Sequence, residues 1–198
     1  MKKRLISLLV ALCMAVTLLP VSAITAWAEK DGQLKIVDGY PVGSGENHDQ
    51  DCSGDGWSYD GSTQTLDLHP DSPTEYDFFS IISGISGYEP ITKCKLTIGG
   101  DATIVGGIFD NTVINNGKIS GGQFSSSSSL TNHGTITGGL FSSVSNESDG
   151  KIENGTFRST VTNNGTIKGG IFDKKPAGDT VASGYTLKVN FPKNGSYE

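Results

Sequence analysis

Four aspartates lie close together in the N-terminal half of the chain: Asp49, Asp51, Asp55 and Asp60. Asp51, Ser53 and Asp55 would place oxygen atoms at positions 1, 3 and 5 of a loop with Gly56 at position 6, as in a calcium-binding EF-hand loop. Position 12 is Ser62, where an EF-hand carries a bidentate glutamate, so the sequence excludes an EF-hand. Two interpretations stay open: a looser calcium site, or an acidic turn that only water solvates.

Aromatic residues gather in the same stretch and are Trp57, Tyr59, Tyr76, Phe78, Phe79 and Tyr88. Sugars stack their C–H faces on flat rings, and nearby carboxylates accept hydrogen bonds from sugar hydroxyls. We therefore take four of these residues as candidate glycan-binding side chains: Trp57, Tyr59, Tyr76 and Tyr88. The alternative is that the rings pack in the core. Glycan binding predicts exposed rings, and a purely structural role predicts buried ones.

The composition excludes several classes of function. The chain of 198 residues has 15 basic and 21 acidic residues, and only Arg158 is an arginine outside the first four residues. Such an acidic chain is a poor candidate for binding nucleic acid or an anionic membrane. His48, His69 and His133 are far apart in the sequence, and no nucleophile or phosphate-binding motif is present. We expect a non-catalytic protein without a cofactor, calcium excepted.

The first residues have the pattern of an export signal. A basic start, Met1 to Arg4, precedes an apolar run from Leu5 to Leu19, and Ala26-Trp27-Ala28 is a small-x-small cleavage pattern. Cleavage after Ala28 would leave 12 basic and 21 acidic residues, because three of the 15 basic residues lie in the signal. The sequence thus predicts a monomer that is secreted, or attached to the cell surface, with no membrane span after cleavage.

Two cysteines remain after the predicted cleavage, Cys52 and Cys94. In an oxidising compartment they could form one disulfide. Two separate thiols are the equally weighted alternative.

A repeat of about 16 residues is the strongest signal in the chain. Five units of the pattern Ile-x-Gly-Gly-x-Phe, relaxed to Asn-Gly in the fourth, end at phenylalanines spaced by 15, 17, 16 and 15 residues: Phe109, Phe124, Phe141, Phe157 and Phe172. A second half-motif with an apolar residue and an asparagine lies between them and contributes Asn115, Asn132, Asn146 and Asn163. Such short units cannot fold alone, and they lack the apolar spacing of a helix.

Stacking these units predicts an all-β fold, a single-stranded β-solenoid with an N-terminal β cap. Glycines and asparagines supply the tight corners, and like residues lie above like residues at the strand spacing of ~4.8 Å. We expect inward ladders of isoleucine, of phenylalanine and of valine or leucine, and a ladder of asparagine side chains at a turn.

Trp57-Ser-Tyr-Asp60, followed by Thr63-Gln-Thr-Leu-Asp-Leu68, resembles the opening of secreted Firmicutes proteins described as carbohydrate-binding-domain-containing. The Gly-Gly-x-Phe units resemble the repeats of the same gut-commensal proteins, so the resemblance covers residues 54–175. It implies a right-handed parallel β-helix that binds an extracellular or host polysaccharide, sometimes with calcium. No set of ligand residues transfers from it.

The chain is thus divided into a signal peptide (1–28), an N-terminal β cap with an acidic loop (29–90), a solenoid of five repeats (91–175), and a linker with an incomplete hairpin (176–198) that resembles the start of a β-grasp module. Phe78–Ile82 and Lys95–Ile98 are expected as first solenoid strands.

The expected function is a secreted or surface-associated glycan-binding or adhesion module. A structural spacer for a missing C-terminal module is the alternative, and a polysaccharide lyase or hydrolase ranks third.

Overall fold

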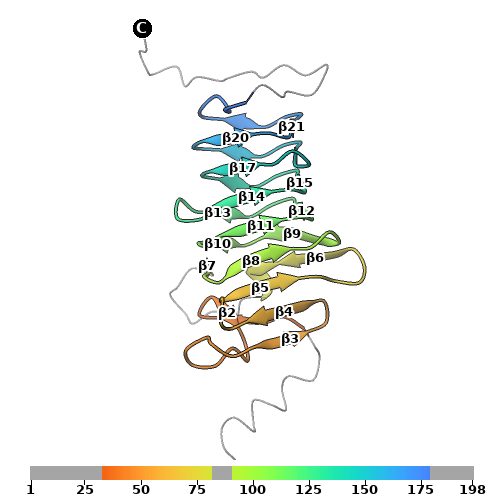
Figure 1. Ribbon diagram of the computed structural model, residues 1–198, viewed down its shortest axis with the longest axis vertical. Helices are drawn as coiled ribbons and strands as arrows, with labels where there is room; N and C mark the ends of the chain where they lie inside the picture. The colour runs from red at the N-terminus through yellow and green to blue at the C-terminus, as the bar shows by residue number, and fades with distance from the viewer. Residues whose placement is uncertain (1–32, 82–90, 179–198) are drawn as a thin grey trace, which may run out of the picture. The chain divides into compact units, whose positions relative to one another are not determined.

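The computed structural model describes residues 33–81 and 91–178, and apart from Gln33 these belong to one compact unit that starts at Leu34. Within this unit, short strands stack from β3 at one end to β20 and β21 at the other (Figure 1). The predicted signal peptide, Tyr88 and the predicted C-terminal hairpin lie outside the described residues.

Five successive turns each give one strand to each of three parallel sheets, which confirms the predicted β-solenoid. The first sheet contains β8 (Lys95–Ile98), β11 (Val113–Asn115), β14 (Leu130–Asn132), β17 (Val144–Asn146) and β20 (Val161–Asn163). The second contains β9 (Ala102–Gly106), β12 (Lys118–Ile119), β15 (Thr135–Ile136), β18 (Lys151–Ile152) and β21 (Thr166–Ile167). The third contains β10 (Ile108–Phe109), β13 (Gln123–Phe124), β16 (Leu140–Phe141), β19 (Thr156–Phe157) and β22 (Ile171–Phe172).

The N-terminal cap is antiparallel. β1 (Ile36–Val37) pairs with β2 (Tyr40–Pro41), and β3 (Cys52–Gly54), β4 (Trp57–Asp60) and β5 (Thr65–Leu68) form a meander. β5 then pairs with β8 in parallel, as do β6 (Thr74–Asp77) with β9 and β7 (Ile91–Thr92) with β10. The parallel stack therefore begins at Thr65, earlier than the predicted start at residue 91.

The predicted strand at Phe78–Ile82 is wrong, because Phe78–Ile81 forms the helical turn α3. This turn carries the Phe78 ring into the core, where it meets the Phe109 ring edge-on at a centroid distance of 5.1 Å. The residue paired with Phe109 on β7 is Thr92, which has no ring. Phe78 thus supplies the aromatic neighbour that the preceding turn lacks.

The predicted apolar ladders are confirmed. The phenylalanine rings from Phe109 to Phe172 stack with centroids 4.7–5.0 Å apart and planes within 17°. The isoleucine ladder is at most 2% exposed and consists of Ile104, Ile119, Ile136, Ile152 and Ile167. Both ladders follow from parallel strands in register, which place each side chain one strand spacing above its equivalent.

The predicted asparagine ladder is confirmed as well. Asn115, Asn132, Asn146 and Asn163 are at most 3% exposed, and each Nδ2 of the first three donates to Oδ1 of the next at 2.6 Å. Asn132, Asn146 and Asn163 also donate to glycine carbonyls of their own turns. These bonds satisfy polar groups that would otherwise be costly to bury.

The first glycine of three Gly-Gly pairs packs directly against the backbone of the preceding turn, at Gly121, Gly138 and Gly169. A Cβ at Gly121 would lie 2.0 Å from the carbonyl oxygen of Val105 on the preceding turn. The second glycine, Gly122, has φ +96°, a conformation that favours glycine. The sharp corner between the second and third sheets thus depends on both positions.

Candidate functional site

The three described candidate glycan-binding rings are buried. Trp57 is 5%, Tyr59 2% and Tyr76 6% exposed, so the expectation of an exposed aromatic platform is not met at these residues. Trp57 pairs with Leu68 and Tyr59 with Leu66 across the β4–β5 ladder, and both leucines are buried. Because paired residues share a face of the sheet, β4 directs its rings into the cap core.

Tyr59 is fixed within this core by a polar contact. Its hydroxyl donates to the backbone oxygen of His48 at 2.9 Å, and the His48 ring stacks on Tyr40 at a centroid distance of 3.9 Å. Burial, followed by the nearby Cys94, raises the pKa of Tyr59 to about 12. Because only 2% of Tyr59 is exposed, its ring has a structural role and offers no face to a sugar.

The β3–β4 hairpin separates the aspartates that the sequence offers as candidate calcium ligands. Asp55 lies in the turn between the two strands, whereas Asp51 and Asp60 lie at the other end of the hairpin. Asp55 follows Asp51 by four residue steps along β3, a separation of roughly 13 Å. The structure therefore does not bring all four carboxylates together.

The carboxylates at the far end of the hairpin accept hydrogen bonds from the turn that follows β4. Asp51 Oδ1 accepts from the Gly61 backbone nitrogen at 2.9 Å, and Asp60 Oδ1 accepts from Ser62 Oγ and from the backbone nitrogens of Ser62 and Thr63. The hydrogen bonds from Ser62 and Thr63 lower the pKa of Asp60. Asp49 is exposed, and its backbone lies against Gly61. Within residues 33–81 and 91–178, no group of three or more His, Cys, Asp or Glu side chains is arranged to hold a metal ion.

Cys52 and Cys94 are not joined by a disulfide in the structure. Cys52 lies on β3 and Cys94 directly precedes β8, and the sheet order is β8-β5-β4-β3. Three strand spacings of ~4.8 Å separate these positions, roughly 14 Å, whereas disulfide-bonded residues have Cα atoms within about 7 Å. The pairing considered from the sequence therefore requires a different strand order from the one observed.

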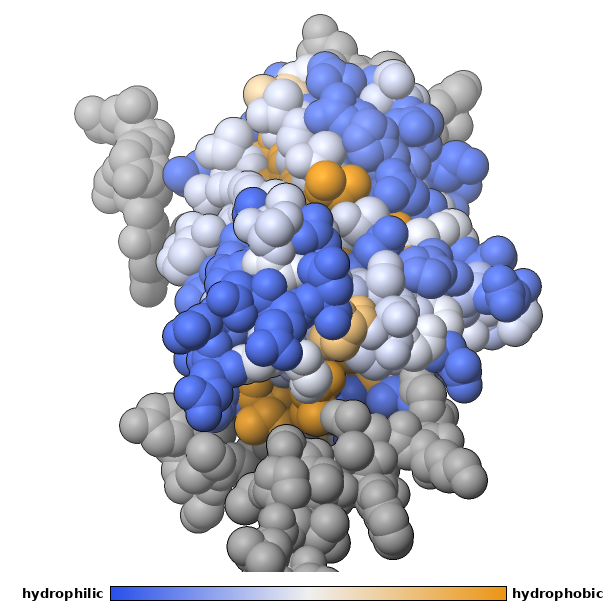
Figure 2. Space-filling model, turned by 60° about the horizontal axis from the view of Figure 1, so that its bottom comes forward, coloured by the Kyte–Doolittle hydropathy of each residue, from blue (hydrophilic) through white to orange (hydrophobic). Residues whose placement is uncertain are grey.

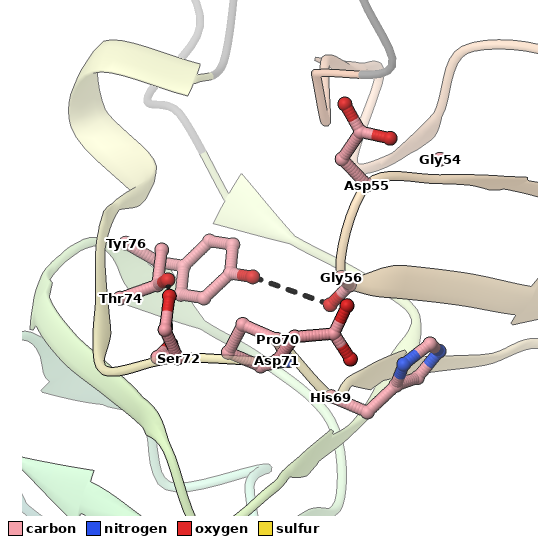
Figure 3. Close-up of a pocket in the computed structure, with 9 residues that line it drawn as sticks. All are labelled: Gly54, Asp55, Gly56, His69, Pro70, Asp71, Ser72, Thr74 and Tyr76. Atoms are coloured by element: carbon pink, nitrogen blue, oxygen red, sulfur yellow. Dashed lines mark hydrogen bonds between the residues drawn. The ribbon is translucent and has the colours of Figure 1, made fainter.

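An open pocket of about 510 Å³ lies between the β3–β4 turn and the loop that joins β5 to β6 (Figure 3). Asp55, His69, Asp71 and Tyr76 line it, and the Tyr76 hydroxyl donates to the backbone oxygen of Gly56 at 3.2 Å. Burial raises the pKa of Tyr76. Among the described residues that line this pocket, none is lysine or arginine.

The pocket unites two predicted site residues with two that the sequence analysis missed. Asp55 and Tyr76 were candidates, while His69 and Asp71 come from the loop after β5. A break in the strand pattern at Pro70 and Pro73 marks this loop in the sequence, but no motif places it beside the β3–β4 turn. The contact that does so is the backbone hydrogen bond from His69 nitrogen to Gly56 oxygen, at 2.8 Å.

The face shown in Figure 2 is mostly polar, with small separate apolar areas. The exposed large apolar side chains of the described residues are Val37, Phe79, Ile114 and Ile171, which come from four different elements. Scattered apolar side chains of this kind are ordinary on a protein surface and define no docking site.

Comparison of the chain with protein-family models, curated proteins and solved structures finds no match. In the described part of the chain, no helix has the length and apolar character of a membrane span.

Proposed function

We propose that this protein is a secreted, non-catalytic structural module, a rigid β-solenoid that acts as a spacer for the segments attached to it. The supporting observation is the burial of Trp57, Tyr59 and Tyr76, which a structural role predicts and a sugar platform does not. The turns repeat one interior of phenylalanine, isoleucine and asparagine ladders, with each turn contacting its neighbours. Stacks of this kind are stabilised turn by turn and hold their length.

The arrangement of charged groups supports a non-catalytic role. A polysaccharide-cleaving enzyme would bring two carboxylates into a groove with a basic residue. Asp55 and Asp71 share the pocket, but Arg158 follows β19, several turns away along the stack. The spacer therefore fits the observed geometry better than the enzyme.

Removal of one complete turn tests the spacer. Deleting residues 113–129 joins Thr112 to Leu130, and the register is kept because Val113 pairs with Leu130. Spin labels on non-natural amino acids at the exposed Ser53 and Thr162 would report the length of the first sheet. We expect a narrow distance distribution that shortens by ~4.8 Å. A broad distribution in the intact chain, or loss of folding on deletion, would contradict the spacer.

The pocket favours glycan binding as a second candidate function. Its volume of about 510 Å³ is within the usual range for small ligands, and its carboxylates and hydroxyls can accept hydrogen bonds from a sugar. A pull-down of the full chain on a panel of polysaccharides, with calcium and then with chelator, tests it. Retention that Asp55→Asn with Asp71→Asn abolishes, and that the exposed Asp101→Asn leaves intact, would establish glycan binding at the pocket. A lack of retention on every polysaccharide would leave the spacer.

A further inference from the structure

Asn154 is the exception in the Gly-Gly corner of the repeat. It occupies the position held by Gly106, Gly121, Gly138 and Gly169 in the other turns. At those glycines a Cβ would meet an atom of the preceding turn at 2.0–2.6 Å. The corner at Asn154 carries a side chain in this crowded position, and its backbone nitrogen makes a long 3.4 Å contact to the Ile136 oxygen.

The Asn154 side chain lies against the backbone nitrogen of the next residue. Gly155 nitrogen donates to Asn154 Oδ1 at 2.9 Å, and Cγ is bonded to that oxygen at ~1.23 Å. The distance from this nitrogen to Cγ is therefore at most roughly 4.1 Å, a limit that includes the separation of ~3–3.5 Å at which two groups react. Asn154 is exposed to solvent, and glycine offers no side chain to block an approach to Cγ.

We propose that Asn154–Gly155 is a site of spontaneous covalent modification, in which the asparagine is converted to aspartate and isoaspartate through a cyclic succinimide. Gly155 nitrogen loses its proton to hydroxide and bonds to Cγ of Asn154. The bond from Cγ to Nδ2 breaks, and Nδ2 leaves as ammonia. One water molecule then opens the ring at either carbonyl, so the net change is the exchange of ammonia for water. No cofactor or enzyme is required.

Asn116–Gly117, another of the four Asn-Gly pairs in the sequence, lacks this geometry. At Asn116–Gly117, the glycine nitrogen donates to Oδ1 of the buried Asn115 at 3.2 Å. This bond directs the nitrogen to the asparagine ladder and away from the side chain of Asn116. Asn111 also accepts a hydrogen bond from the nitrogen of the next residue, but that residue is Thr112, which is β-branched, and Asn111 Nδ2 is held by the Lys93 oxygen at 2.7 Å.

Conversion would alter the fourth corner of the solenoid. Isoaspartate adds one atom to the main chain between β18 and β19, where Thr156 nitrogen bonds to the Gly139 oxygen and Ile171 nitrogen to the Gly155 oxygen. It also places a new negative charge beside Glu153, which pairs with Lys168 at 3.0 Å. We therefore expect the modified chain to open at this corner before it opens elsewhere.

Peptide mass analysis of the full chain after incubation at mildly alkaline pH tests the proposal, with the native chain compared with the chain in concentrated urea. In the native chain, Asn154 should be converted roughly tenfold faster than Asn116. In urea the two sites should be converted at similar rates, because both are Asn-Gly. Equal rates in the native chain, or an unchanged Asn154 while both sites react in urea, would overturn the proposal.

Two variants separate the chemistry from its structural effect. Asn154→Gly restores the Gly-Gly corner and should remain unmodified there, with the native circular dichroism. Asn154→Asp carries the new charge without the extra main-chain atom. Incubated wild-type chain should be cleaved by protease near residue 154 faster than either variant. Equal cleavage of all three would show that the modification leaves the corner intact and would overturn the predicted opening.

Discussion

The Nδ2 of Asn115 donates to Oδ1 of Asn132 at 2.6 Å, one turn further along the solenoid and inside the core. Asn132 makes the same bond to Asn146, so the hydrogen bonds of the ladder all run in the same direction through the core. Each asparagine in the middle of this ladder is both donor and acceptor to its neighbours. The ladder thus specifies register as well as stability.

Asn132→Ala is therefore expected to destabilise the chain by about 3 kcal/mol, because it leaves the Asn115 donor and the Asn146 acceptor buried without their partners. Urea denaturation followed by circular dichroism measures the loss. Asn116→Ala, at an exposed asparagine of the same corner, should change stability by less than about 0.5 kcal/mol. Equal effects of the two substitutions would show that the ladder contributes nothing to stability.

Gly121→Ala tests the close approach of successive turns. The added Cβ would lie 2.0 Å from the Val105 oxygen, a backbone atom that cannot move alone, and we expect a loss of about 1–3 kcal/mol. Gly100 is the matched control, since a Cβ there meets nothing within 4 Å, and Gly100→Ala should leave the melting temperature nearly unchanged. A Gly121→Ala protein as stable as the control would contradict the assigned packing.

Thr92→Val should stabilise the protein. Thr92 is 1% exposed. Among the buried side-chain polar atoms of the described residues, its hydroxyl oxygen lacks a hydrogen-bond partner. Valine has nearly the same shape without the polar group, so we expect a gain of about 1 kcal/mol in thermal or urea unfolding. Thr97→Val, on the outward face of β8, should have little effect. A destabilised Thr92→Val protein would mean that the hydroxyl has a partner.

Stability should fall in alkali. Burial raises the pKa of Cys94 from 9.0 to about 12 and that of Tyr59 from 10.0 to about 12. At a pH between the unfolded and folded pKa values, the Cys94 thiol and the Tyr59 hydroxyl keep their protons in the folded chain and have lost them in the unfolded chain. The contribution of these two groups to stability is therefore complete below pH 9 and is lost as the pH rises to about 12. Urea midpoints measured at intervals across this range check the slope. Cys94→Ala should flatten it, and an unchanged slope would exclude the thiol as a cause.

The period of the repeat was sufficient to predict the solenoid and its ladders. Phe141 and Ile136 could be placed inside, and Asn132 in a ladder at a turn, because in a stack of equal turns the neighbours of a residue are its own equivalents. The contacts between turns can therefore be predicted from the repeat itself. The same logic explains why Phe78 was misplaced, since it lies before the regular turns and reaches Phe109 through a helical turn.

The cap has no sequence repeat from which its contacts could be predicted, and only the tertiary structure decided which of its residues are buried. Strand alternation in β4 shows that Trp57 and Tyr59 share a face, but the pairing of β4 with β5 and of β5 with β8 makes that face the buried one. The β3–β4 hairpin likewise separates Asp51 from Asp55, and the fold of the β5–β6 loop brings Asp71 to the pocket. Local sequence determines which side chains point together, whereas the strand order determines whether they meet the core, a turn or solvent.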